Sequence, residues 1–184
     1  MVLFINCCVR ENSRTALLAN GLLSKINKPY TELKLENCDF PRVDENYLKK
    51  RDMLIGQKRF DDPMFDLARQ FAEADETVIA APYWDLSFPA SLKQYFEVIN
   101  VIGVTFRYNE QGIPEGLCKA KKIYYVTTAG GNYVPEEFGF GYVKALAQGY
   151  YSIKDAELIK ATGLDIYGAD TEKILSDCIK NIKI

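Results

Sequence analysis

Short apolar runs alternate with longer segments of helical periodicity along this chain, and the two patterns predict different elements. Runs rich in β-branched residues, such as the one at residues 77–81, are typical of buried parallel strands. They predict strands over residues 2–7, 30–35, 77–81, 122–127 and 156–161. Apolar residues that recur every three or four positions predict helices over residues 13–26, 61–74, 89–101, 135–150 and 171–182.

Two segments interrupt this alternation. Residues 37–59 are polar and mixed, and they predict a long loop that contains a short helical piece. Residues 103–118 predict a β-hairpin, because the β-prone residues 104–108 are followed by the turn-like sequence Asn109-Glu110-Gln111-Gly112.

Five strands separated by helices predict an α/β fold, a three-layer α/β/α sandwich around a parallel sheet with right-handed crossovers. For one domain over residues 1–184 we expect the flavodoxin-like strand order 2-1-3-4-5. In that order the loops after strands one, three and four meet at the carboxyl edge of the sheet. Open α/β sheets bind their ligands at this edge.

Composition narrows the range of functions. The net charge of −2 gives no basic footprint for nucleic acid and no polybasic patch for a membrane surface. The five cysteines are odd in number and form no CxxC pair, which argues against a disulfide framework or a zinc module and favours a reducing cytoplasm. We also expect no signal peptide and no segment that spans a bilayer.

The chain contains no histidine. This excludes serine–histidine and cysteine–histidine nucleophile pairs and removes the commonest ligand of zinc and non-haem iron. We therefore expect no metal site and no catalytic side chain. If the protein is an enzyme, we expect a cofactor to supply the chemistry.

The first of the three loops leads into the helix predicted at residues 13–26. The start of a helix binds anions through its unpaired N–H groups and its dipole. Here Ser13 and Thr15 add hydroxyl groups, and Arg10 and Arg14 add positive charge. The same residues also fit an ordinary N-cap with solvated arginines around it. Neither GxGxxG nor GxxxxGK[ST] occurs, so a Rossmann fingerprint and a Walker loop are unsupported.

The second and third loops offer two further parts of a ligand site. Pro82 and Pro89 restrict the backbone between them, so that Tyr83 and Trp84 can form a flat apolar wall. In the third loop, residues 127–133, the glycines let the backbone approach a ligand closely. Each loop alone also fits an ordinary turn. Together the three loops offer a phosphate cradle, an aromatic wall and close backbone contact, which are the requirements of flavin mononucleotide (FMN).

Residues 81–131 also carry a family resemblance. They keep, in order, P-x-x-[ND]-x-x-x-P, L-K-x-[YF]-x-[DE], GVTF-[RK]-Y and a final GG. On these motifs the chain resembles the flavodoxin-like FMN-dependent NADH-azoreductases and NAD(P)H:quinone oxidoreductases, and weaker similarity covers nearly the whole chain. The resemblance implies non-covalent FMN, a homodimer, and ping-pong transfer of hydride from NAD(P)H to flavin N5 and then to a quinone, azo or related acceptor.

The residues and the resemblance together assign roles in all three loops. Cofactor binding falls on Cys8, Arg10, Ser13, Arg14, Thr15, Pro82, Tyr83, Trp84, Asp85, Leu86, Thr128, Ala129, Gly130, Gly131 and Asn132. The resemblance places Tyr108 where the family has the aromatic residue that closes the acceptor pocket, opposite Trp84.

Three positions depart from the family pattern. Cys8 replaces a usual serine, which weakens one phosphate hydrogen bond if the side chain made it. Asp85 replaces a common asparagine, and its carboxylate would oppose negative charge on a reduced flavin unless only its backbone N–H faces the ring. Ala120-Lys121 replaces Gly-Lys, which should matter little.

Two other functions share the expected fold. A flavodoxin-type electron carrier with no substrate of its own is the alternative, although such carriers are usually far more acidic than a net charge of −2. A receiver-like signalling domain needs an acidic cluster after the first strand, where this chain has Cys7, Cys8 and Val9. The sequence leaves open the choice between NADH and NADPH.

Overall fold

A five-stranded parallel sheet runs through the computed structural model, which describes residues 1–184. The strands are β1 (Val2–Asn6), β2 (Tyr30–Lys34), β3 (Glu76–Ala80), β6 (Lys122–Thr128) and β7 (Asp155–Ala161). Their order is β2-β1-β3-β6-β7, and all four pairings are parallel. Because β4 and β5 form a separate hairpin, this is the predicted order 2-1-3-4-5, and the predicted fold class is confirmed.

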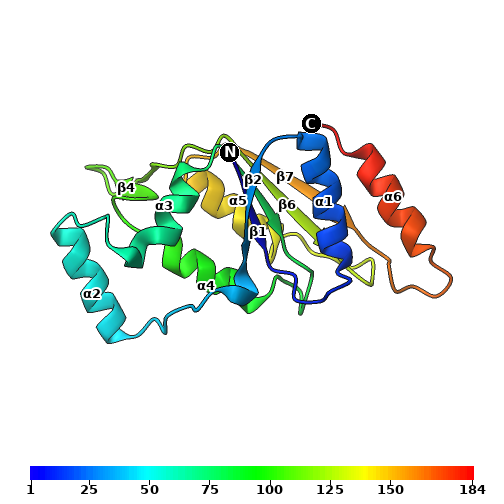
Figure 1. The fold of residues 1–184 in the computed structure, drawn as a ribbon, viewed down its shortest axis with the longest axis horizontal. Helices are drawn as coiled ribbons and strands as arrows, with labels where there is room; N and C mark the ends of the chain where they lie inside the picture. The colour runs from blue at the N-terminus through cyan, green and yellow to red at the C-terminus, as the bar shows by residue number, and fades with distance from the viewer.

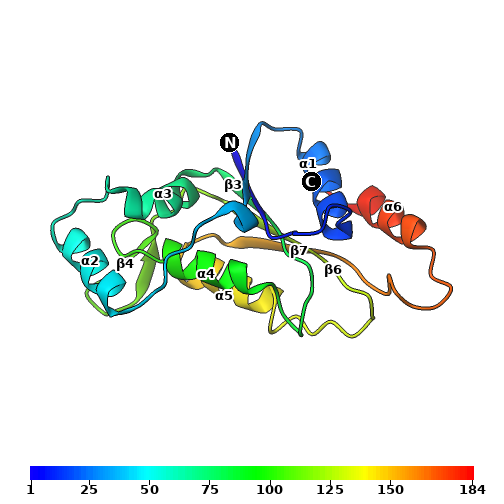
Figure 2. The ribbon, with the colours of Figure 1, turned by 60° about the horizontal axis from the view of Figure 1, so that its bottom comes forward.

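Helices cover both faces of the sheet, as Figures 1 and 2 show. One face carries α1 (Arg14–Ile26) and α6 (Thr171–Asn181), and the other carries α3 (Asp66–Glu73), α4 (Ala90–Ile99) and α5 (Phe140–Gly149). Successive strand residues point to opposite faces. Phe4 therefore packs in the core under α1, whereas Ile5 packs in the core under α3, α4 and α5.

The segment at residues 37–59 contains more helix than expected. A 3-10 turn (Leu35–Asn37) is followed by α2 (Glu45–Gly56), which has 12 residues. The Asp44 side chain caps this helix by accepting the Tyr47 N–H at 3.0 Å. Leu54 is the only fully buried residue of α2, so its sequence lacks the apolar stripe by which a helix is recognised.

Two predicted helices begin differently in the structure. The helix expected from residue 135 begins at Phe140, because the Glu136 carbonyl accepts N–H bonds from Gly139 and Gly141 in a turn that precedes it. The helix expected from residue 61 begins as a 3-10 turn (Pro63–Phe65) that is capped by the Asp62 side chain.

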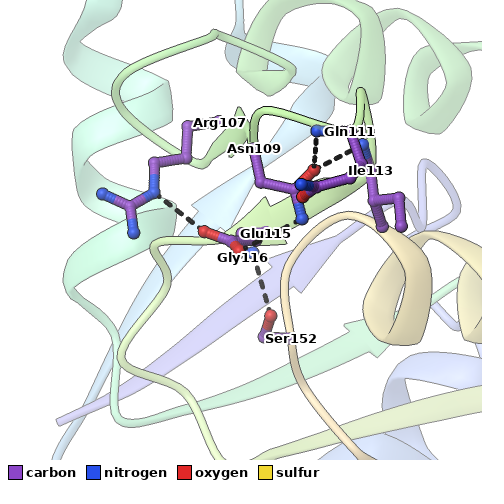
Figure 3. A network of polar contacts seen from close by, with 7 residues as sticks. All are labelled: Arg107, Asn109, Gln111, Ile113, Glu115, Gly116 and Ser152. Atoms are coloured by element: carbon purple, nitrogen blue, oxygen red, sulfur yellow. Dashed lines mark hydrogen bonds and ion pairs between the residues drawn. The ribbon is translucent and has the colours of Figure 1, made fainter.

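The predicted hairpin is present as β4 (Phe106–Tyr108) and β5 (Pro114–Gly116). Figure 3 shows the polar network that holds it. The Asn109 side chain accepts the N–H groups of Gln111 and Ile113, at 3.0 Å and 2.9 Å, and Arg107 pairs with Glu115 at 3.1 Å. A further bond from the Gly116 N–H to the Ser152 hydroxyl (2.8 Å) joins the hairpin to the body of the protein. No helix of the structure has both the length and the apolar character needed to cross a bilayer.

Gly116 is where the hairpin and the body meet most closely. A Cβ at this position would lie 2.0 Å from the Tyr151 carbonyl carbon, and a backbone atom cannot move aside cheaply. We expect Gly116→Ala to lower the free energy of unfolding by about 1–3 kcal/mol, measured by urea titration. Gly149→Ala is the control, because a Cβ added there would have no atom within 4 Å. Equal losses in the two variants would contradict the close packing at Gly116.

Candidate functional site

The loop after β1 ends in an anion-binding geometry. Ser13 is the N-cap of α1, and its hydroxyl accepts the Ala16 N–H at 3.3 Å. The backbone N–H groups of Ser13, Arg14 and Thr15 have no acceptor within the protein. These donors lie at the positive end of the α1 dipole, so they are available to an anionic ligand.

Asn6 fixes the course of this loop. Its side-chain amide donates to Glu32 at 2.7 Å, and its oxygen accepts the Cys8 N–H at 2.9 Å. Cys8 is itself almost fully buried, and burial raises the pKa of its thiol, while a hydrogen bond with Ser13 opposes that rise. The thiol is therefore neutral near pH 7 and does not repel an anion.

The three predicted loops line one cavity of about 120 Å³ at the carboxyl edge of the sheet. Its walls are formed by Cys8, Val9, Arg10, Asn12, Ser13, Arg14, Thr15, Pro82, Tyr83, Trp84, Thr128, Ala129, Gly130 and Asp165. The first and third loops are joined directly, since the hydroxyls of Thr15 and Thr128 share a hydrogen bond of 2.6 Å. Of the residues predicted to bind the cofactor, Asp85, Leu86, Gly131 and Asn132 lie outside this lining.

The second loop contains a tight turn with an uncommon backbone. The N–H and C=O groups of Trp84 and Ser87 bond to each other at 2.9 Å and 2.8 Å, and Asp85 and Leu86 between them have φ angles of +49° and +69°. Positive φ at both central positions is typical of a type I′ turn, which normally uses glycine or asparagine. The Asp85 and Leu86 N–H groups have no acceptor within the protein.

This turn is also held from both sides. The Tyr83 N–H donates to the Thr128 carbonyl at 3.2 Å, and the Ser87 hydroxyl donates to the Phe138 carbonyl. Trp84 is 38% exposed, so part of its ring is available at the mouth of the cavity.

The third loop presents N–H groups on one side because its carbonyls are occupied on the other. The carbonyls of Ala129, Gly130 and Gly131 accept the N–H groups of Leu164, Asp165 and Gly163 respectively. The N–H groups of Gly130, Gly131 and Asn132 have no acceptor. A loop with this arrangement can stabilise negative charge on a ligand.

Sequence reasoning missed the fourth wall of the cavity, the loop after β7. Arg14 donates to the Asp165 carboxylate at 2.8 Å and to the Leu164 carbonyl at 3.2 Å. The hydrogen bond with Arg14 holds the pKa of Asp165 below its ordinary value. The available signal was topological: β7 also ends at the carboxyl edge, so its loop belongs beside the other three.

The structure does not bring Tyr108 to the cavity of its own chain. Its hairpin is anchored through Gly116 to Ser152, which precedes β7 and so lies at the amino end of the sheet. The cavity lies at the carboxyl end, and β4 is far from the start of α1 in Figure 1. The predicted pocket role of Tyr108 therefore stays a prediction and requires a second copy of the chain.

The residues present fit a flavin nucleotide. The loops that form the cavity carry three groups of N–H donors without protein acceptors, at residues 13–15, 85–86 and 130–132. Residues 13–15 and Gly130 line the cavity, whereas residues 85–86 and 131–132 lie just outside its lining. The cavity is smaller than the roughly 300–1,000 Å³ of a complete ligand pocket, so a nucleotide would extend past its mouth, where Trp84 is exposed. A phosphate at the α1 start and a planar ring near the other two donor groups would match the donors.

Comparison with solved structures defines the class of protein. An azoreductase from Bacillus anthracis superposes with a TM-score of 0.81 at 25% identity, covering 97% of this chain and 94% of that one. An FMN-dependent NADH-azoreductase from the same species, solved in complex with FMN, has a TM-score of 0.80 at 21% identity and supports the fold alone. The family model described as "Flavodoxin-like fold" matches residues 1–183. The class is that of flavodoxin-like α/β proteins.

Sequence relatives narrow this class to one family. The FMN-dependent NADH:quinone oxidoreductase of Coprothermobacter proteolyticus is 35% identical over 180 residues, which are 92% of this chain and 89% of the relative. The enzyme of the same name from Clostridium beijerinckii is 34% identical over 191 residues, 99% of this chain and 96% of the relative. The chain belongs to the flavodoxin-like family of FMN-dependent NADH:quinone oxidoreductases and azoreductases. The prediction of an oxidoreductase is thereby confirmed.

The strained turn allows a direct test. A leucine in the left-handed region costs roughly 1–2 kcal/mol, whereas glycine adopts this conformation freely. We expect Leu86→Gly to raise the free energy of unfolding by about 1 kcal/mol, measured by urea titration. Leu86→Ala separates strain from side-chain loss, because alanine keeps the Cβ and should give no gain. A similar gain in both variants would show that the exposed leucine side chain, and not the φ angle, is responsible.

Proposed function

We propose that the chain binds FMN non-covalently in the cavity at the carboxyl edge of the sheet. There it transfers hydride from NAD(P)H to a quinone, azo or related acceptor by a ping-pong mechanism. The observation that carries this proposal is that three loops, each with unpaired N–H donors, meet around one cavity beside an exposed tryptophan. The relatives named above support it, since both are named as FMN-dependent and NADH-using.

The residues of the first loop would hold the phosphate of FMN. The N–H groups of Ser13, Arg14 and Thr15 at the start of α1 have no acceptor within the protein, and Arg10 and Arg14 line the same cavity. The protonated Cys8 thiol adds no negative charge. Most of the attraction therefore comes from oriented backbone dipoles, which need no reorganisation when the anion binds.

Residues of the second and third loops would orient the ring. Trp84 and Tyr83 offer the flat surface, and the unpaired N–H groups at residues 85–86 and 130–132 would stabilise negative charge on the reduced ring. The Asp85 side chain is exposed, so water would screen its carboxylate while its N–H remains a donor. When bound, FMN would supply the redox chemistry, accepting a hydride from the nicotinamide and passing it to the acceptor.

We also propose that the protein works as a homodimer in the cytoplasm. Tyr108 is 47% exposed on the hairpin of β4 and β5, and only a second copy could bring this residue over the cavity. The exposed apolar residues Ile113 and Leu117 beside it favour a protein partner on this side. The five cysteines are all unpaired, which agrees with a reducing compartment.

The first test is the visible spectrum of the protein reconstituted with FMN, followed under anaerobic conditions. We expect NADH to bleach the bound flavin without any acceptor, because the proposed mechanism has two independent half-reactions. After the nucleotide is removed, a quinone should restore the yellow colour. The same experiment with NADPH decides the nucleotide preference, and the names of the relatives favour NADH.

Other outcomes would favour other functions. Flavin that binds but is not bleached by either nucleotide would favour the electron-carrier alternative. Failure of the protein to bind FMN would overturn the proposed function.

The dimer is tested by complementation between two variants that are each impaired in a different part of the site. Tyr108→Ala should raise the KM for quinone without changing FMN affinity, and Arg14→Glu should abolish FMN binding. If Tyr108 acts across the dimer, mixing and exchanging the two variants should restore the normal KM in about a quarter of the sites, because half the dimers are mixed and each carries one intact site. No restoration, or a monomer by light scattering, would contradict this arrangement.

A further inference from the structure

The loop after β7 contacts the other loops at the anion end of the cavity. Its Asp165 N–H donates to the Gly130 carbonyl at 2.9 Å, and its carboxylate accepts from Arg14 at 2.8 Å. A single residue of this loop thus binds both the glycine loop after β6 and the first residue of α1. Arg14 and Asp165 also both line the cavity.

The position of the Asp165 carboxylate requires the glycine beside it. A Cβ on Gly130 would lie 2.2 Å from one carboxylate oxygen of Asp165 and 3.1 Å from the Asp165 Cβ. A side chain at residue 130 would therefore displace Asp165 and, with it, the partner of Arg14. A Cβ on Gly131 would have no atom within 4 Å, so within this glycine pair the close approach is confined to Gly130.

A carboxylate at the edge of an anion site needs an explanation, because its charge opposes an anionic ligand. Asp165 is 64% exposed, so water screens much of its charge and the ion pair itself contributes little to stability. Orientation is the larger effect. An arginine side chain loses about 2 kcal/mol of rotamer entropy when it is fixed, and Arg14 is already fixed by Asp165 and Leu164.

The bonds of Arg14 also leave it able to bind a second anion. Both of its contacts use the same nitrogen, Nη1. A guanidinium group has five N–H donors, so those on Nε and Nη2 are not committed to these contacts. The carboxylate can therefore hold one side of the guanidinium while the other side binds a phosphate.

We infer that Asp165 is a positioning residue for the FMN phosphate, acting through Arg14. This inference rests on the proposed function. Asp165 holds the Arg14 guanidinium beside the N–H groups at the start of α1. The arginine side chain is therefore already ordered before the phosphate binds, and less entropy is lost on binding. We expect the role to be selective for the phosphate, because the Asp165 carboxylate has Arg14 as its hydrogen-bond partner.

The test compares FMN with riboflavin, which has the same ring and ribityl chain but no phosphate. Dissociation constants are measured by quenching of flavin fluorescence. We expect Asp165→Asn to weaken FMN binding about three- to ten-fold and to leave riboflavin binding unchanged. In an Arg14→Gln background, Asp165→Asn should have no further effect on FMN, because the group it positions is gone.

Glu11→Gln is the matched control for charge. Glu11 lies in the loop after β1, forms no hydrogen bond or ion pair with Arg14 and does not line the cavity. Removal of its negative charge should leave FMN binding unchanged or strengthen it slightly, since lost repulsion favours an anion. A loss of FMN affinity in Asp165→Asn is therefore opposite in sign to the effect of charge removal alone.

The other outcomes are distinct. Stronger FMN binding by Asp165→Asn would overturn the inference and identify Asp165 as a competitor for Arg14. Equal weakening of FMN and riboflavin would also overturn it and assign Asp165 to general loop support. Failure of the wild-type chain to bind either flavin would overturn the proposed function itself. If the wild type binds FMN and Asp165→Asn binds it with the same dissociation constant, only the role of Asp165 is overturned.

Discussion

The parallel pairing of β1, β3 and β6 is the constraint on which the site depends. In this register Asn6 lies beside Ala80, and Ala80 lies beside Val126. The ladder continues past the strand ends, because the Cys7 N–H bonds to Ala80 and the Ala81 N–H bonds to Val126, both at 2.9 Å. β1 and β3 therefore leave the sheet at the same level, while β6 continues beside β7 for two more residues, to Thr128.

Beyond the ends of β1, β3 and β6, the backbone N–H groups of the loops determine which ligand the site can bind. The N–H groups at the start of α1, in the turn at residues 85–86 and at residues 130–132 have no protein acceptor and, apart from that of Thr15, belong to residues that are partly or fully exposed, so a ligand can reach them. The turn also places Asp85 and Leu86 at positive φ. Strain of this kind persists only where the surrounding structure holds it. The bonds from Tyr83 to Thr128 and from Ser87 to Phe138 provide that support.

The sequence was sufficient for those parts of the molecule that depend on local patterns. The β-branched runs predicted all five sheet strands, and the strand–helix alternation predicted their order. The helix α2 could not be predicted at its full length, because Leu54 is its only fully buried residue and an exposed helix has no apolar stripe. The start of α5 was misplaced because Gly139 and Gly141 form a turn through bonds to Glu136 that periodicity does not reveal.

In the candidate site, too, the sequence predicted what local patterns and strand order determine, and missed what depends on long-range contacts. Residues in the loops that connect a strand to the next helix, such as Ser13, Trp84 and Gly130, were found because topology brings these loops together. Asp165 was missed because its role depends on a contact with Arg14, 151 positions earlier, which no local pattern encodes. The position of Tyr108 depends on the attachment of its hairpin to Ser152 at the opposite end of the sheet.

The charge state of the site follows from the same residues. Burial raises the pKa of the Cys8 thiol, and Arg14 lowers the pKa of Asp165. Because one shift is upward from a basic value and the other downward from an acidic value, neither group changes its charge near neutral pH. The chain also has no histidine, the side chain that usually changes its charge near neutral pH. The backbone dipoles do not titrate at all. The Cys8 thiol, the Asp165 carboxylate and the backbone dipoles therefore present the same charges to an anionic ligand throughout the neutral pH range.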